Sequence, residues 1–170
     1  MLLNCHTYYS FGYGTLSIEE LLNEVAAKGY QSFVLSDINN TSACIDMVRA
    51  ANEKGVKSII GIDFRNGIKQ QYIGIAKNNN GFKELNKHLS EHLHEAKNLQ
   101  SVCPELPDTY IIYPFQNYTG RALRENEFIG VSIKDLPRLQ FSDLKNQTNK
   151  LVVLHAVSFI HKAHFNAHHL

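Results

Sequence analysis

The residues best suited to chemistry stand where the first apolar run of the sequence ends. That run closes at Cys5, and His6 is followed by hydroxyls, aromatic rings and two glycines in "TYYSFGYG". This layout is typical of a strand that delivers polar side chains to a site at its C-terminal end. A lone histidine there is more often hydrogen-bonded than metal-bound, and we expect a hydrogen-bonded His6.

Cysteine chemistry is not expected. Cys5 stands beside His6, but adjacent residues of a strand point to opposite faces and cannot form a nucleophile–base pair. We therefore predict Cys5 to be a small core residue. Cys5, Cys44 and Cys103 are odd in number and show no CxxC spacing, which is typical of reduced thiols in a cytoplasm and not of a zinc ribbon.

Two groups of histidines have helical spacing. His88 and His92 lie one helical turn apart, but "HLSEH" is not the His-Glu-x-x-His motif of zinc enzymes, so we expect a polar helix face that also carries His94. We likewise expect no natural metal site in the C-terminal group of His161, His164, His168 and His169.

Asp37, at the end of "FVLSD", is the other candidate catalytic carboxylate. A structural role as the cap of the next helix is the better expectation, because Asp caps helices well. The sequence contains no G-x-S-x-G motif and no P-loop, and "FGYG" lacks the third glycine of a dinucleotide-binding loop.

The elements that must position these residues alternate between strands and helices. Ser17 and Glu20 form a capping box before a helix that Gly29 closes, and Gly55 closes the next helix. Helices are predicted at 18–28, 41–54, 80–96 and 134–139, with a last helical segment in "HKAHFNAHHL". Strands are predicted at 2–6, 32–37, 57–64, 70–76, 108–114, 127–133 and 150–159.

This alternation predicts an α/β fold. Strands that alternate with helices form a parallel sheet, and seven strand candidates favour a barrel over an open sheet. In such a fold the site lies where strands end and the loops to the helices begin.

The composition is that of an ordinary globular domain. Apolar residues make up 44% and charged residues 19% of the 170 residues, and the net charge of +1 argues against a strong electrostatic grip on nucleic acid. There is no signal peptide and no apolar run long enough to span a membrane, so we expect a cytoplasmic protein. The last helix stops without a cap, so residues 1–170 are expected to be an N-terminal piece of a longer chain.

Three segments resemble the polymerase and histidinol phosphatase (PHP) domain: "NCHTYYSFGYGTLSIEELL", "FVLSDINNTSACIDMVRAANEKGVKSIIGIDF" and "YIGIAKNNNGFKELNKHLS". They are most similar to the PHP domain at the N-terminus of replicative DNA polymerase III alpha subunits of the Bacteroidetes type. The resemblance is strong to about residue 95 and implies a distorted (β/α)7 barrel, here shortened, with parallel strands.

Active members of this family hold a cluster of metal ions and hydrolyse phosphoesters, and the sequence departs from their ligand pattern. The opening His-x-His is replaced by Asn4 and His6, and an Asp by Tyr13. A Glu is shortened to Asp63. The remaining ligand positions fall on Ile38, Gln71, Ala156 and Ser158. Only His6 and Asp63 keep a good ligand type, fewer than the three protein ligands of a catalytic zinc.

The resemblance therefore implies a PHP domain without metal, without catalytic residues and without a cofactor of its own. Its role would be structural or subunit-docking. In such a polymerase, Mg²⁺ would serve the polymerase domain, the thumb region and a proofreading exonuclease subunit would be partners, and DNA would be bound by the parent chain. We expect Tyr13 and Ile38 to fill the former cluster site. Two alternatives stay open: a stand-alone PHP phosphoesterase that uses His6 and Asp63, and a free-standing interaction module.

Overall fold

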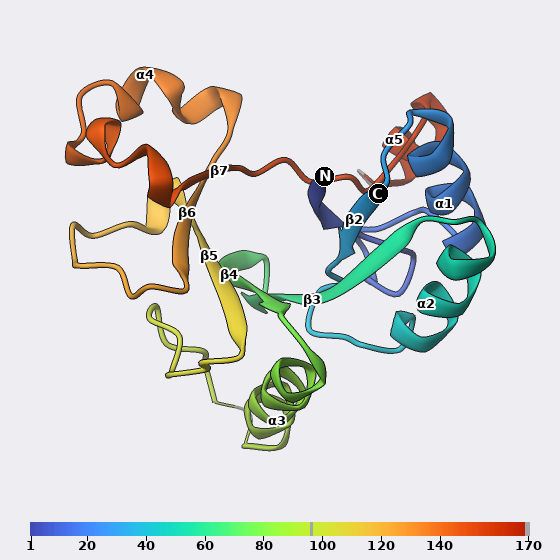
Figure 1. Cartoon of the computed structure of the whole chain (residues 1–170), viewed down its shortest axis with the longest axis horizontal. Coiled ribbons are helices and arrows are strands. Elements are labelled where there is room, and N and C mark those ends of the chain that lie inside the picture. The colour runs from blue at the N-terminus through green and yellow to red at the C-terminus, as the bar shows by residue number, and fades with distance from the viewer. Residues whose placement is uncertain (96, 169–170) are drawn as a thin grey trace. The chain divides into compact units, whose positions relative to one another are not determined.

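The computed structural model describes residues 1–95 and 97–168 (Figure 1). The chain divides into two compact units, which are treated separately below. Unit 1 consists of Met1–Asp63 and the segment from Ala156 onward, and unit 2 is Phe64–His155. His169, one of the C-terminal histidines considered above, lies outside the described residues.

Strands and helices follow one another in the predicted order. The strands are β1 (Leu2–Cys5), β2 (Ser32–Leu35), β3 (Lys57–Asn66), β4 (Lys69–Ala76), β5 (Thr109–Pro114), β6 (Glu127–Val131) and β7 (Leu151–Val153). The helices are α1 (Ile18–Ala27), α2 (Cys44–Glu53), α3 (Asn79–Glu95), α4 (Leu136–Leu139) and α5 (Lys162–His168). The strands form one sheet in the order β1-β2-β3-β4-β5-β6-β7, and the fold class is α/β as expected.

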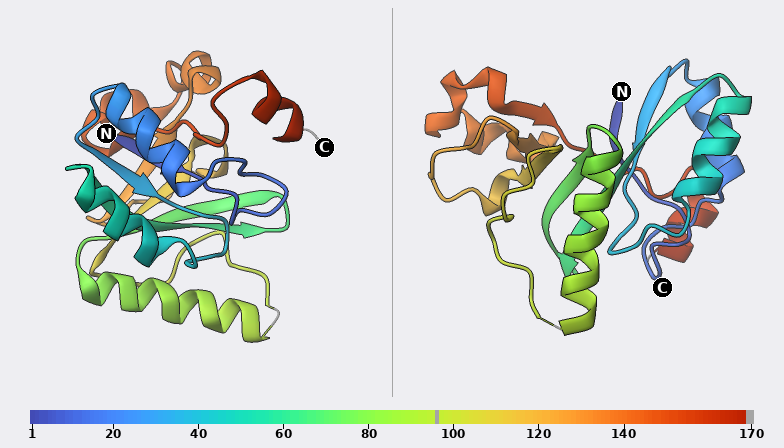
Figure 2. Two further views of the ribbon diagram at one scale, coloured as in Figure 1. Left: turned by 90° about the vertical axis from the view of Figure 1, so that its right-hand side faces the viewer. Right: turned by 60° about the horizontal axis from the view of Figure 1, so that its bottom comes forward.

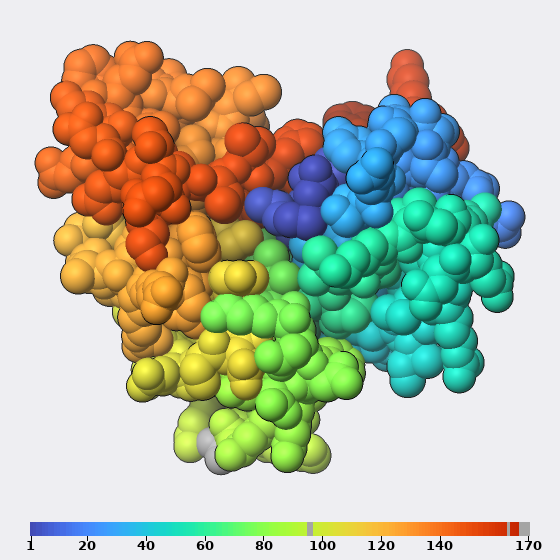
Figure 3. Space-filling view, viewed as in Figure 1, coloured from blue at the N-terminus to red at the C-terminus, as the bar shows by residue number. Residues whose placement is uncertain are grey.

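Unit 1 is built on parallel pairing of β1 with β2 and of β2 with β3. The predicted capping box begins α1: the Glu20 amide donates to Ser17 Oγ over 3.1 Å, and the Ser17 amide donates to the Glu20 carboxylate over 2.8 Å. The apolar face of α1 is buried, and α1 packs beside α2 (Figure 3). Gly29 and Gly55 end these helices with φ values of +73° and +67°, a conformation in which glycine costs least.

The segment after unit 2 returns to unit 1 and pairs with β1. The amide of His6 donates to the Val157 carbonyl over 2.9 Å, and the amide of Val157 donates to the Asn4 carbonyl over 2.8 Å. The backbone amide and hydroxyl of Thr15 both donate to the Ser158 carbonyl. Residues distant in sequence are thereby fixed at the C-terminal end of β1.

Unit 2 corrects the expectation of an all-parallel sheet. β5, β6 and β7 are parallel, but β4 runs antiparallel to β5. The reason lies in the connection from β3 to β4, which consists of Gly67 (φ +58°) and Ile68 alone. A connection this short joins antiparallel strands, because parallel strands need a crossover of a dozen residues. The long helix α3 lies along β4 and packs on it (Figure 2).

Some element bounds differ from the predicted ones. α2 begins at Cys44 instead of residue 41, because the Asn40 side chain accepts a hydrogen bond from the Ser42 amide and holds a turn there. The segment expected to be helical from Lys134 is a 3₁₀ turn at Ile133–Asp135 followed by the single-turn α4. Of the described helices, none is both long and apolar enough to cross a membrane.

Candidate functional site

His6 lies at the C-terminal end of β1 and is fully buried. Its Nδ1 lies 3.3 Å from Ser10 Oγ. A serine hydroxyl has one hydrogen, and Ser10 donates it to Asp37 Oδ1 over 2.7 Å. The network therefore assigns a hydrogen to His6 Nδ1, which donates to Ser10. The hydrogen-bonded His6 expected from the sequence is what the structure contains.

Asp63 is the residue that faces the other nitrogen of this imidazole. His6 Nε2 and Asp63 Oδ2 are 3.7 Å apart, and both side chains are fully buried. Asp63 lies in β3, and its backbone forms a parallel bridge with Ile38. His6 and Asp63, the two residues of a good metal-ligand type among those considered in the sequence analysis, are thus brought together within unit 1.

Asp37 does not cap a helix, contrary to expectation. The cap position of α2 is Ala43, which has no side-chain capping bond. The Asp37 carboxylate instead accepts 2.7 Å hydrogen bonds from the Thr7 amide, the Thr7 hydroxyl and the Ser10 hydroxyl. Burial raises the pKa of this carboxyl above its usual value, although the three hydrogen bonds favour the ionised form. Asp37 ties the loop after β1 to the end of β2.

The other side chains and backbone groups around His6 that the sequence analysis singled out are poor metal ligands. The side-chain oxygen Oδ1 of Asn4 accepts a hydrogen bond from the Ser36 hydroxyl over 2.9 Å. The ring of Tyr13 packs edge-on against His6, with a distance of 4.9 Å between the ring centroids. Tyr13 therefore fills space beside His6, in agreement with the expectation for this residue. The backbone amide of Ile38 donates to Ser10 Oγ over 3.0 Å.

Three positions remain. Ala156 is partly buried, and Ser158 is buried; both belong to unit 1. Gln71 belongs to unit 2, where its side chain donates to the Lys69 carbonyl over 3.1 Å. Within residues 1–95 and 97–168, no group of three His, Cys, Asp or Glu side chains is arranged to hold a metal ion.

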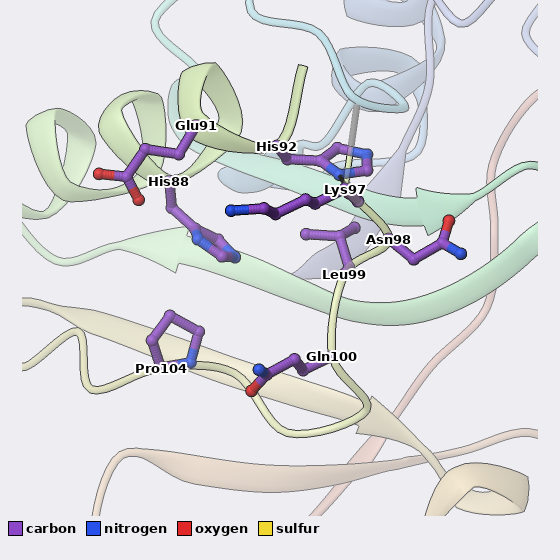
Figure 4. Close-up of a pocket in the computed structure, with 8 residues that line it drawn as sticks. All are labelled: His88, Glu91, His92, Lys97, Asn98, Leu99, Gln100 and Pro104. Carbon is purple, nitrogen blue, oxygen red and sulfur yellow. Dashed lines mark hydrogen bonds between the residues drawn. The ribbon is translucent and has the colours of Figure 1, made fainter. Parts of the chain in front are cut away.

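Unit 2 contains a pocket of about 270 Å³ at the C-terminal part of α3 (Figure 4). The expectation that His88 lies on a polar helix face is wrong. His88 is half-buried, and its Nε2 lies 2.7 Å from the Tyr72 hydroxyl. Desolvation lowers the pKa of His88. His92 Nδ1 is bonded to the Lys97 carbonyl. Glu91, Lys97 and other side chains complete the lining: Asn98, Leu99, Gln100 and Pro104.

The three cysteines are free thiols, as predicted, and all three are buried, which had been predicted for Cys5 alone. Burial raises the pKa of Cys5, Cys44 and Cys103 to about 12 in each case, so their thiols stay protonated and unreactive at neutral pH.

Unit 2 contains a second buried polar network, which the sequence analysis did not predict. Glu127 is fully buried and receives both guanidinium nitrogens of Arg121, at 2.7 and 2.9 Å, and the Tyr113 hydroxyl at 2.8 Å. Burial works to raise the pKa of Glu127, but these donors and the Arg124 amide hold it below its usual value. A lone Glu at the start of an apolar strand was the only available signal.

A comparison with protein families decides the relationship: the model of the PHP domain matches residues 3–128. The chain belongs to the PHP domain family.

The relatives of this PHP domain include two DNA polymerase III alpha subunits. It is 36% identical over 86 residues to the DNA polymerase III subunit alpha of Ureaplasma parvum and 32% identical over 91 residues to that of Vibrio cholerae. These matches cover 50% and 49% of this chain, but only 9% and 8% of the two relatives.

Two solved structures are similar over 56% of the PHP domain and 35% of their own chains. One, from Bifidobacterium adolescentis, is described as a metal-dependent phosphoesterase (17% identity, TM-score 0.39). The other is an amidohydrolase from Chromobacterium violaceum with bound sulfate and no metal (19% identity, TM-score 0.40).

Proposed function

We propose that this chain is the N-terminal PHP domain of a replicative DNA polymerase III alpha subunit, and that the domain itself is structural and holds no catalytic metal centre. The similarity to two alpha subunits supports the first part. In this proposal the parent chain synthesises DNA with Mg²⁺ in its polymerase domain and works in the cytoplasm. The domain packs against the rest of that chain, including the thumb region, and offers a docking place to a proofreading exonuclease subunit.

The donor set around His6 supports the second part. A metal centre that hydrolyses phosphoesters needs several imidazoles and carboxylates to hold its ions and acidify a bound water. Unit 1 offers the imidazole of His6 and the carboxylate of Asp63, while Ile38 and Ala156 have no donor atom in their side chains. The side-chain oxygen of Asn4 already accepts a hydrogen bond from the Ser36 hydroxyl. These residues do not fit a cluster of ions.

Asp37 does not supply the missing metal ligands. Its two oxygens accept three short hydrogen bonds from Thr7 and Ser10, which occupy most of the acceptor capacity that a carboxylate could offer to a metal ion. The carboxylate thus stabilises the loop between β1 and α1, where a catalytic relative would need open ligands.

An activity measurement tests this proposal. The purified chain is incubated with single-stranded DNA and with p-nitrophenyl phosphate, with zinc or manganese added, beside the variants His6→Ala and His155→Ala. His155 is an exposed histidine and serves as the matched control. We expect no turnover above that of the variants. Metal-dependent turnover that His6→Ala abolishes and His155→Ala leaves intact would refute the structural role.

The second candidate is a PHP phosphoesterase with a depleted site, which the 3.7 Å approach of His6 Nε2 to Asp63 Oδ2 favours. In that case, the double variant Asn4→His/Ile38→His should raise an existing activity by restoring two imidazoles. If the site is structural, the same variant gains metal affinity without any starting activity.

A further inference from the structure

Strands β5 and β6 present an aromatic pair at the surface of unit 2. Tyr110 is 44% exposed, and Phe128 is partly exposed. The two rings meet edge to face, with centroids 5.9 Å apart and planes at 71°. They share one face of the sheet, because Phe128 pairs with Ile112, which lies two residues after Tyr110 along β5.

A lysine lies over each ring. Lys77 Nζ is 4.7 Å from the centroid of Tyr110, and Lys150 Nζ is 5.3 Å from that of Phe128. We call Lys77, Tyr110, Phe128 and Lys150 the β5–β6 platform.

Backbone carbonyls hold both ammonium groups in place. Lys77 Nζ donates to the Pro107 carbonyl over 2.9 Å, and Lys150 Nζ donates to the Arg124 and Glu125 carbonyls over 2.7 and 2.9 Å. An ammonium group has three donors, so these bonds leave two on Lys77 and one on Lys150 for an anionic ligand. Anchored cations beside exposed rings offer phosphate contacts and stacking surfaces together.

The surrounding charge favours an anionic ligand. Lys and Arg outnumber Asp and Glu in unit 2, and Arg124 contributes its backbone carbonyl to the anchor of Lys150, while its guanidinium donates to the Cys103 and Pro104 carbonyls. Three carboxylates lie near the platform along the chain. Glu127 is fully buried and bonded to Arg121, and Asp108 accepts a 3.0 Å hydrogen bond from the Asn78 side chain. The third, Glu125, follows Arg124 and is exposed.

We propose that the β5–β6 platform binds single-stranded nucleic acid, with bases stacked on Tyr110 and Phe128 and phosphates on Lys77 and Lys150. Every base has a π-face, so such binding tolerates sequence, and it discriminates against duplexes, whose base faces are hidden. This inference goes beyond the proposed function and does not depend on it.

The test is a titration of the 170-residue chain into a fluorescein-labelled oligo(dT), followed by fluorescence anisotropy at low salt. Tyr110→Leu and Phe128→Leu remove a ring while keeping apolar bulk, and each is expected to weaken binding about tenfold. Tyr110→Phe should bind as the unchanged chain does. The exposed Phe141 supplies the matched control Phe141→Leu, which should leave binding unchanged.

The salt dependence tests the lysines. Lys77→Gln and Lys150→Gln should each lower the slope of log affinity against log salt by about 0.7, while Lys83→Gln, which removes an exposed charge on α3, should change it less. Unlabelled duplex should compete poorly with the labelled strand.

Circular dichroism melts identify any variant that fails to fold. The comparison of oligo(dT) binding by Tyr110→Phe and Tyr110→Leu is then the decisive one, because both substitutions are mild. Absence of binding at low salt, equal competition by duplex, or equal loss in the platform and control variants would each overturn the proposal.

Discussion

His6 Nε2 and Asp63 Oδ2 lie 3.7 Å apart with both side chains fully buried, although the two residues are 57 positions apart in sequence: His6 directly follows β1, and Asp63 lies within β3. In the function proposed above, this pairing is what remains of a constellation that catalytic PHP relatives are expected to fill with imidazoles and carboxylates. Around it, the side chains of Thr7, Ser10 and Asp37 form a closed hydrogen-bond network. These hydrogen bonds stabilise the loop after β1.

The buried carboxylate of Asp37 is the first point at which this view can be tested. Asp37→Asn replaces an acceptor by an amide that must point its NH₂ group at one of the donors of Thr7 or Ser10. We expect a loss of about 2–3 kcal/mol in the free energy of unfolding, measured by urea denaturation. Asp46→Asn, at an exposed carboxylate of α2, should change it by less than about 0.5 kcal/mol. Equal effects of the two substitutions would contradict the structural role of Asp37.

Glu127 makes the free energy of unfolding depend on pH in the acidic range. Its folded-state pKa lies below the ordinary value of 4.5, so its stabilising contribution is complete above pH 4.5 and is lost as the pH falls through the folded-state pKa. Glu127→Gln should lower the free energy of unfolding by about 2 kcal/mol at pH 7, and the difference from the unchanged chain should shrink toward pH 3. The exposed neighbour Glu125 supplies the control Glu125→Gln. A difference that stays constant with pH would count against the buried ion pair with Arg121.

The three thiols should be protected as long as the protein is folded. Burial and a pKa of about 12 predict that Cys5, Cys44 and Cys103 do not react with a disulfide reagent at pH 8, and that all three react in guanidinium chloride. The variant Ser90→Cys places a thiol at an exposed position of α3 and should react at once. Fast reaction of a native thiol would show that part of the core opens readily.

Local signals in the sequence predicted the fold well. The capping box of Ser17 and Glu20 and the closing glycines act within one helical turn, so the helix bounds followed from neighbouring residues. The reversed strand β4 was missed although "NG" at Asn66 and Gly67 is a hairpin signal, because the alternating pattern elsewhere favoured a parallel sheet.

The errors at the site have a different cause. The partners of Asp37 are 27 and 30 residues away in sequence, and no spacing rule connects a carboxylate with hydroxyls on another strand's loop. His88 was expected on a polar face, but the neighbouring strand β4 supplies Tyr72 as its partner. Both errors concern tertiary contacts, which periodicity along one element does not encode.

The metal content of the purified protein tests the central claim most directly. The chain is prepared without a histidine tag and without chelators, and zinc, manganese and iron are measured by elemental analysis beside His6→Ala, Asp63→Ala and His161→Ala. We predict a content well below one equivalent, unchanged by His6→Ala and Asp63→Ala, because two donors fall short of a catalytic site. One or more equivalents of metal that disappear with His6→Ala or Asp63→Ala, and persist with His161→Ala, would contradict the account.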